Sequence, residues 1–217
     1  MMSGQWPRMS LSSDHQLRED MTPKPHRPPA PRISEIVLRT SQFVTMRTWY
    51  ALVLSADPSF EYGEEGGGPN GDGRVMDFHR LCFLRLYAEF PYTQVLALFE
   101  IPKLRASSGD SCGLHHMQFR NASLDELADR YELLYGQEIR PYQCFNHGPA
   151  ISFYYEDPDR NLVELSAPCF DTQNDYLEFF KSPGYKANPT GVAIEADQFV
   201  AALRRGADRR ELVRMPS

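Results

Sequence analysis

The sequence predicts an α+β protein in which two βαβββ modules pair into a curled, mostly antiparallel sheet around a central cleft, with the helices outside. Two observations lead to this fold class. A strand-like segment followed by an amphipathic helix and further strands occurs twice along the chain. The two occurrences also superpose when the sequence is shifted by 81 residues without a gap. The modules therefore span 33–102 and 113–168.

The first module opens with ISEIVLRT (33–40), whose β-branched residues favour a strand. Segment 41–54 follows with the apolar spacing of an amphipathic helix, at Phe43, Met46, Tyr50 and Val53. Residues 62–74 are rich in glycine but lack the Lys-Ser/Thr of a phosphate-binding loop, and this predicts a flexible insertion. Residues 78–102 then indicate two strands joined by a turn near Pro91.

The second module repeats this order. A strand with the sequence HMQFR (116–120) precedes a helix that begins with Ser123 and Glu126, a capping-box pair. AISFYYEDPDRNLVELSAP (150–168) indicates a strand, a turn and another strand. The 81-residue shift aligns similar or identical residues of the two modules, namely Leu38 with Phe119, Arg39 with Arg120, Phe43 with Leu124, Met46 with Leu127, Tyr50 with Tyr131 and Leu52 with Leu133.

The two ends of the chain differ from the modules. Residues 1–32 are rich in Pro, Ser, Arg and Lys and bury too little apolar surface to offset their ordering entropy, so we expect a disordered arm. Residues 169–217 contain short amphipathic stretches, and we expect a C-terminal tail of helices and loops that packs on the modules.

Composition restricts the partners. A net charge of −6 disfavours nucleic acid and anionic membrane surfaces, so we expect a small-molecule partner, no nucleic acid and no membrane. The sequence shows no signal-peptide pattern and no apolar run of roughly 18 residues, and we expect a cytoplasmic protein. The four cysteines form no C-x-x-C pair and are expected to be free thiols.

The adjacent histidines His115 and His116 are candidates for metal ligation. Alternation along a strand places His116, Gln118 and Arg120 on one face, so only one of the two histidines faces a given metal ion. The 81-residue register aligns His116 with Glu35, and this register and the family motif described below both select His116. His115 is then expected to contact a helix or to lie on the surface.

Glu164 lies within the apolar strand NLVELSA, where a carboxylate is costly without a partner. Its alternative role is that of a surface residue on an edge strand. Glu35 has the same alternative, because it stands at the start of its strand.

Several motifs together resemble the vicinal oxygen chelate superfamily, which includes glyoxalase I, extradiol ring-cleaving dioxygenases and the fosfomycin and bleomycin resistance proteins. The segments EIVLRT, GLHHMQF, NHGPAISFYYEDPDRN and NPTGV are similar to glyoxalase-like, biphenyl-2,3-diol dioxygenase-like proteins of fungi and bacteria. The resemblance covers 33–195 and assigns 33–168 to the vicinal oxygen chelate domain. It is also compatible with a homodimer.

The resemblance implies a divalent metal ion (Fe, Mn, Zn or Ni) held by Glu35, His116 and Glu164. Imidazole and carboxylate ligands suit such an ion. His147 in NHGP and Tyr154 in SFYY match positions that contact substrate in ring-cleaving relatives, and both side chains transfer protons. The alternatives are a loop-capping role for His147 and a core-packing role for Tyr154.

Four residues depart from the family pattern. Relatives commonly have His at the position of Glu35, and one His with two carboxylates favours a Lewis-acid site over an Fe(II) oxygenase. Thr93 and Gln94 stand where ring-cleaving relatives often carry a His pair, and the register of Gln94 stays open. Arg160 replaces the usual glycine of the DPDGN turn, which costs strain if that position requires positive φ.

The leading hypothesis is a metal-dependent enzyme that acts on a small oxygenated, including aromatic, metabolite by isomerase, lyase or dioxygenase-like chemistry. The alternative is a non-catalytic protein of the same fold that binds or sequesters a small molecule.

Overall fold

The computed structural model describes residues 28–63, 78–104 and 112–215 of the chain. The chain divides into two units, 1–32 and 33–217. In the first unit, residues 28–32 form neither helix nor strand. Most of the expected disordered arm and most of the expected glycine-rich insertion lie outside the described residues.

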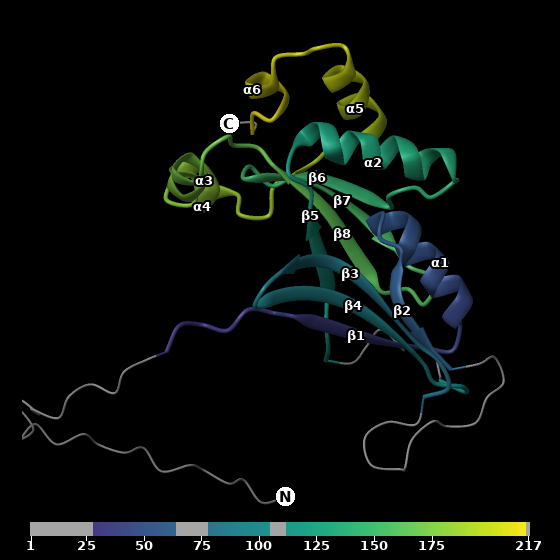
Figure 1. Ribbon diagram of the computed structural model, residues 1–217. Coiled ribbons are helices and arrows are strands. Elements are labelled where there is room, and N and C mark those ends of the chain that lie inside the picture. The colour runs from purple at the N-terminus through teal and green to yellow at the C-terminus, as the bar shows by residue number, and fades with distance from the viewer. Residues whose placement is uncertain (1–27, 64–77, 105–111, 216–217) are drawn as a thin grey trace, which may run out of the picture. The chain divides into compact units, whose positions relative to one another are not determined.

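The second unit contains two separately hydrogen-bonded sheets (Figure 1). The first sheet runs in the order β1 (Glu35–Thr40), β4 (Tyr92–Glu100), β3 (Leu81–Glu89) and β2 (Pro58–Tyr62). The second runs in the order β5 (His116–Arg120), β8 (Leu162–Pro168), β7 (Ala150–Glu156), β6 (Gln143–Asn146) and β9 (Val192–Ala193). Strand pairs β1–β4 and β5–β8 are parallel and all the others are antiparallel. The predicted α+β class with two βαβββ modules is therefore confirmed.

Helix α1 (Phe43–Leu54) covers the first sheet, and α2 (Leu124–Gly136) covers the second. The residues that α1 buries are the four predicted from its spacing. The Ser123 hydroxyl caps α2 by accepting from the Glu126 N–H at 3.2 Å, and the Glu126 carboxylate accepts from the Ala122 N–H at 2.7 Å. Both strands and both helices start at positions separated by the predicted 81 residues.

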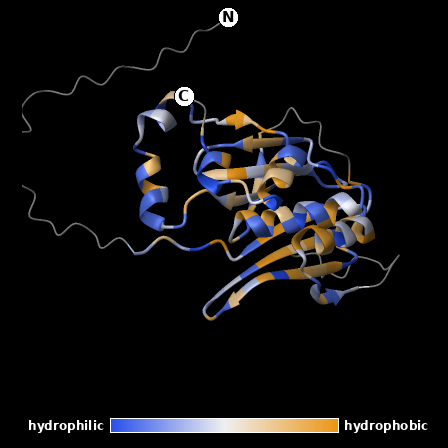
Figure 2. Cartoon of the chain, turned by 90° about the horizontal axis from the view of Figure 1, so that it is seen from above, coloured by the Kyte–Doolittle hydropathy of each residue, from blue (hydrophilic) through white to orange (hydrophobic). Residues whose placement is uncertain are grey.

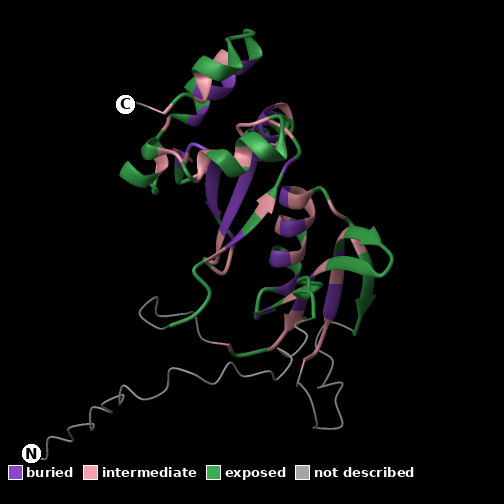
Figure 3. Cartoon of the chain, turned by 90° about the vertical axis from the view of Figure 1, so that its left-hand side faces the viewer, coloured by how far each residue is buried: buried purple, intermediate pink, exposed green. Residues whose placement is uncertain are grey.

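Strand alternation divides the side chains of β8 between two faces of the sheet. In β8, Val163, Leu165 and Ala167 pack into the hydrophobic core, while Leu162, Glu164 and Ser166 occupy the other face. Hydrophobic residues concentrate on the strands and on one side of the helices (Figure 2). Strands β7 and β8 are largely buried, whereas β2 and the tip of the β3–β4 hairpin are exposed (Figure 3). The polar side chains considered below therefore lie on the sheet face opposite the helices.

Side-chain hydrogen bonds join the two modules at the β7–β8 turn. The Tyr50 hydroxyl of α1 donates to the buried Asp157 carboxylate at 2.8 Å, and Gln42 Nε2 donates to Asp159 Oδ1 at 2.7 Å. Burial raises the pKa of Asp157. Arg160, in the same turn, has a φ of +68°, so this position does require the left-handed region that glycine adopts more readily.

The C-terminal tail contains α3 (Gln173–Phe179), α4 (Pro183–Ala187), α5 (Ala196–Arg204) and α6 (Arg209–Leu212). It also contributes β9, which pairs with β6 and extends the second sheet, where only helices and loops were expected. Helix α5 buries Phe199, Val200 and Leu203 in the core. Within the described residues, no helix is both long and apolar enough to span a membrane.

Candidate active site

The Glu164 carboxylate is the centre of a polar cluster on the second sheet. Glu164 is only 3% exposed, and its partners in the strand register are Gln118 on β5 and Tyr154 on β7. Gln118 Nε2 and Ser152 Oγ both donate to Glu164 Oε1, at 2.7 and 2.6 Å. These charge-assisted hydrogen bonds offset the cost of burying a carboxylate and fix its orientation.

His116 contacts the other carboxylate oxygen. Its Nε2 lies 2.9 Å from Glu164 Oε2. This separation suits a direct hydrogen bond, and it also matches the separation of about 3 Å between two neighbouring ligand atoms of an octahedral ion bound at roughly 2.1 Å. His116 and Glu164 therefore fit two adjacent ligand positions of a divalent metal ion.

His115 is exposed, as expected for a surface residue, but it also contacts its neighbour. Its Nδ1 lies 2.8 Å from the Nδ1 of His116, so one ring nitrogen donates and the other accepts. Strand alternation does not separate the two side chains, because β5 begins at His116 and His115 precedes it. This contact fixes the His116 ring from the side opposite Glu164, as a second partner commonly does for a ligating histidine.

Glu35 is not brought into this cluster. It begins β1 in the first sheet and is exposed, and its carboxylate has no hydrogen-bond or ion-pair partner within the described part of the chain. Among the residues that the structure describes, no group of three or more His, Cys, Asp or Glu side chains is arranged to hold a metal ion. The structure thus places two of the three predicted ligands together.

Strand pairing also settles the counterpart of Glu164 in the first module. Glu35 pairs with Val95 as His116 pairs with Leu162, and two residues further along each strand stand Ala97 and Glu164. The first module therefore carries no carboxylate at this position. Alignment of the sequence alone left this register open.

His147 and Tyr154 form a second pair beside the carboxylate. His147 Nδ1 lies 2.7 Å from the Thr190 carbonyl oxygen, which only accepts, so this nitrogen carries the proton. In the neutral ring Nε2 is then an acceptor, and the Tyr154 hydroxyl, 3.0 Å away, donates to it. Burial and the nearby Glu164 carboxylate raise the pKa of Tyr154, so its hydroxyl is protonated at neutral pH.

The tail holds His147 in place. The Thr190 carbonyl belongs to the NPTG turn, in which Gly191 has a φ of +82° and a Cβ would lie 2.3 Å from the Asn146 oxygen. Asn188 Oδ1 accepts from the Gly191 N–H at 2.9 Å and closes this turn. The motif appears in the sequence only as part of the family resemblance, and the structure supplies its physical role.

Two supporting residues, Gln118 and Ser152, were not identified as partners of Glu164 from the sequence. Ser152 lies two residues before Tyr154, so strand alternation places both side chains on one face of β7. This alternation is visible in the sequence and places Ser152 on the same strand face as a candidate site residue. Gln118 was placed on the His116 face, but its partner depends on the parallel register of β5 with β8. That register is a tertiary feature that the local pattern does not specify.

A cavity of about 740 Å³ adjoins the edge of β5. Its walls come from the end of α1, the β3–β4 hairpin and β5, and they include Gln94 and Gln118. Gln94 therefore lines a cavity that reaches the residue orienting Glu164. A volume of this size is typical of a small-molecule site.

Comparison with known proteins agrees with this fold. The chain is 32% identical to biphenyl-2,3-diol 1,2-dioxygenase 2 of Rhodococcus globerulus over 176 residues, which cover 81% of this chain and 83% of the relative. It is 29% identical to biphenyl-2,3-diol 1,2-dioxygenase 3 of the same organism over 184 residues, covering 84% and 87%. No family model matches the chain.

Solved structures show weaker likeness. Lactoylglutathione lyase of Agrobacterium tumefaciens is 19% identical, with 65% of this chain and 96% of that one covered and a TM-score of 0.44. The fosfomycin resistance protein FosX of Listeria monocytogenes is 14% identical, with 68% and 98% covered and a TM-score of 0.47. Because of the sequence identity to the first dioxygenase, the chain belongs to the vicinal oxygen chelate superfamily.

Proposed function

We propose that the chain is a metal-dependent enzyme that acts on a small oxygenated metabolite. Aromatic vicinal diols are the first substrates to test, since both dioxygenase relatives are named for one. The observation that carries the proposal is the His116–Glu164 pair at 2.9 Å, in which a nearly inaccessible carboxylate is oriented by Gln118 and Ser152. A buried carboxylate with this many partners is typical of functional sites.

His116 and Glu164 would hold the ion, and Glu35 remains the proposed third ligand. A bound divalent ion supplies Lewis-acid polarisation of the substrate oxygens. The chain's own residues then decide geometry: Gln118 and Ser152 keep Glu164 oriented, and His115 keeps the His116 ring oriented. These three contacts hold the two-residue pair in position before any ligand arrives.

His147 is the proposed general base and acts through Tyr154. The Tyr154 hydroxyl accepts the proton of a substrate hydroxyl while it passes its own proton to His147 Nε2. This relay forms no free tyrosinate, in agreement with the raised pKa of Tyr154. The resulting imidazolium is stabilised by the Thr190 carbonyl, which accepts from Nδ1.

Metal content tests the site. Protein purified without chelator and reconstituted separately with Fe(II), Mn(II), Zn(II) or Ni(II) is expected to hold about one ion per chain. His116→Ala and Glu164→Ala should lose the ion, and Glu35→Ala should lose it if Glu35 is the third ligand. Glu156→Gln, an exposed carboxylate change on β7, is the matched control and should retain it. A wild-type protein that binds none of the four ions would contradict the proposal.

Oxygen uptake with an aromatic vicinal diol separates the reaction types. Uptake with ring cleavage indicates dioxygenase chemistry, whereas product formation without uptake indicates isomerase or lyase chemistry. In either case, removal of the base in His147→Ala should lower kcat by about 10²-fold or more. An unchanged kcat would remove His147 from the mechanism.

A non-catalytic small-molecule-binding protein is the second candidate. It is favoured by the isolated position of Glu35 and by Ala97, which stands where the second module has its carboxylate. Tight ligand binding by a protein that holds no metal ion and shows no turnover would support this candidate over the enzyme.

A further inference from the structure

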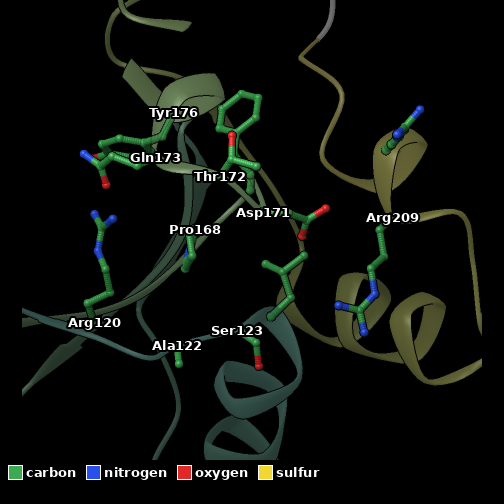
Figure 4. Close-up of a pocket in the computed structure, with 13 residues that line it drawn as sticks. Arg120, Ala122, Ser123, Pro168, Asp171, Thr172, Gln173, Tyr176 and Arg209 are labelled. Carbon is green, nitrogen blue, oxygen red and sulfur yellow. The ribbon is translucent and has the colours of Figure 1, made fainter. Parts of the chain in front are cut away.

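A second cavity, of about 500 Å³, lies where the tail meets the second module (Figure 4). Its walls come from the end of β5, the start of α2, the segment that leads from β8 into α3, and α6. Neither His116 nor Glu164 lines it. Arg120 and His116 lie on the same face of β5 but four residues apart, which corresponds to about 13 Å along a strand. Arg120 also lines the 740 Å³ cavity beside β5, whereas Arg209 and Arg210 line only the second cavity.

The charged residues that line this cavity are mainly arginines, namely Arg120, Arg209, Arg210 and a single carboxylate, Asp171. Their formal charges sum to +2, and Asp125, the ion-pair partner of Arg209, lowers the net charge around the cavity to +1. The Arg209 guanidinium also forms an ion pair with Asp125 of α2, which attaches α6 to the start of that helix. Figure 4 shows Arg120 and Arg209 on opposite walls with Asp171 between them. The cavity thus concentrates positive charge on a chain whose net charge is −6.

Two of these arginines have no carboxylate partner in the part of the chain that the structure describes. The guanidinium carbon of Arg120 lies 5.4 Å from the centre of the Tyr176 ring, a cation–π contact that leaves its N–H donors available. The Arg210 side chain forms no ion pair there, although its backbone N–H donates to Asp208. Unpaired guanidinium groups in a concave site are suited to binding an oxyanion through paired hydrogen bonds.

We propose that this cavity binds a phosphate monoester. A phosphate group carries a charge of about −1.5 to −2 at neutral pH and offers three acceptor oxygens to the Arg120 and Arg210 guanidinium groups, whereas a carboxylate carries a charge of −1 and offers two. The volume is within the range of small-molecule sites and is larger than the phosphate alone requires. Phe170 and Tyr176 offer aromatic surface to the organic part of the ligand.

The side-chain oxygens of Ser123 and Thr172 accept the hydrogen bonds that cap α2 and α3, and neither hydroxyl is assigned to the ligand. The binding energy comes from the arginines of β5 and α6. The C-terminal tail thereby completes a site that the second module alone would leave open.

Isothermal titration of the full chain with phenyl phosphate, inorganic phosphate and benzoate tests the proposal at constant ionic strength. We expect saturable binding in the order phenyl phosphate, inorganic phosphate, benzoate. Arg120→Gln and Arg210→Gln should each weaken phenyl phosphate binding by about tenfold or more, as expected when a charge-assisted hydrogen bond is lost. Arg120→Lys should lower the affinity for phenyl phosphate by an intermediate amount, because lysine keeps the charge but lacks the paired N–H donors of the guanidinium group.

Arg205→Gln is the matched control. Arg205 is an exposed arginine of the same tail that does not line the cavity, and its removal changes the net charge equally. Its phenyl phosphate affinity should equal that of the wild type. The proposal is overturned if the wild type shows no saturable binding at millimolar ligand, if benzoate binds as tightly as phenyl phosphate, or if Arg205→Gln weakens binding as much as Arg120→Gln. None of these outcomes depends on the metal site.

Discussion

The hydrogen bond from Ser152 to Glu164 should contribute measurably to stability. Ser152 is fully buried, so Ser152→Ala removes a hydroxyl without exposing the site. The change leaves Glu164 Oε1 with one donor, Gln118, in place of two. Loss of a hydrogen bond to a buried carboxylate costs about 2 kcal/mol. For a chain of this size the midpoint of thermal unfolding should fall by about 4–8 °C.

Ser166 provides the matched control on the neighbouring strand. It is also fully buried, but its hydroxyl has no hydrogen-bond partner in the described part of the chain. Ser166→Ala should therefore be neutral or stabilising, because it removes an unpaired polar atom. Circular dichroism measures both variants, with thermal unfolding for the midpoint and urea unfolding for the free energy. Equal losses of stability in Ser152→Ala and Ser166→Ala would refute the assigned role of the Ser152 hydroxyl.

Three further predictions follow from other contacts. Tyr50→Phe should lower the free energy of unfolding by about 1.5–3 kcal/mol through loss of its hydrogen bond to Asp157. Tyr155→Phe removes a buried hydroxyl that has no hydrogen-bond partner among the described residues, and it should be nearly neutral in the same urea assay. Arg160→Gly should raise the midpoint of urea unfolding, because glycine adopts the left-handed φ of this position without strain, and the free energy of unfolding should rise by up to about 1 kcal/mol. Arg160→Ala keeps the Cβ and should not raise the free energy of unfolding. In native protein at pH 8, one thiol per chain should react rapidly with a thiol reagent, because Cys112 is exposed. This rapid reaction should be lost in Cys112→Ser. Burial raises the pKa of the other thiols, to about 11 for Cys82 and about 12 for Cys144 and Cys169.

The sequence predicted the repeated architecture well, because both modules express it in local patterns. Helix α1 buries the apolar positions that its spacing indicates, and the capping pair Ser123 and Glu126 marks the start of α2. The fully buried Glu164 and its contact with His116 also agree with the expectation that a carboxylate in an apolar strand requires partners.

Other features depend on which strands become neighbours. Two-residue β9 is too short to carry a periodic signal, and it exists because β6 offers a free edge. Gln118 reaches Glu164 only through the β5–β8 register. The isolation of Glu35 has the same origin: β1 belongs to a different sheet, so the sequence register that equates it with His116 does not place the two side chains together.

Both modules have a tyrosine–aspartate hydrogen bond from the same helical position, but the aspartates belong to different parts of the chain. Tyr50 and Tyr131 occupy the same helical position, and both hydroxyls donate to an aspartate. Tyr50 contacts Asp157 in the second module, whereas Tyr131 contacts Asp197 in the tail. The tail therefore supports α2 as the second module supports α1.

The two modules also differ in what they contribute to the candidate active site. The hydrogen-bonded residues of the candidate active site that the structure describes come from the second module, apart from Thr190, which the tail supplies. The first module instead holds the β7–β8 turn from outside, through Tyr50 and Asp157. Because that turn leads directly into the strand of Glu164, a loss of the Tyr50 hydroxyl should loosen the carboxylate as well as lower stability. Metal affinity that falls in Tyr50→Phe but not in Tyr155→Phe would show this coupling, and equal affinities would exclude it.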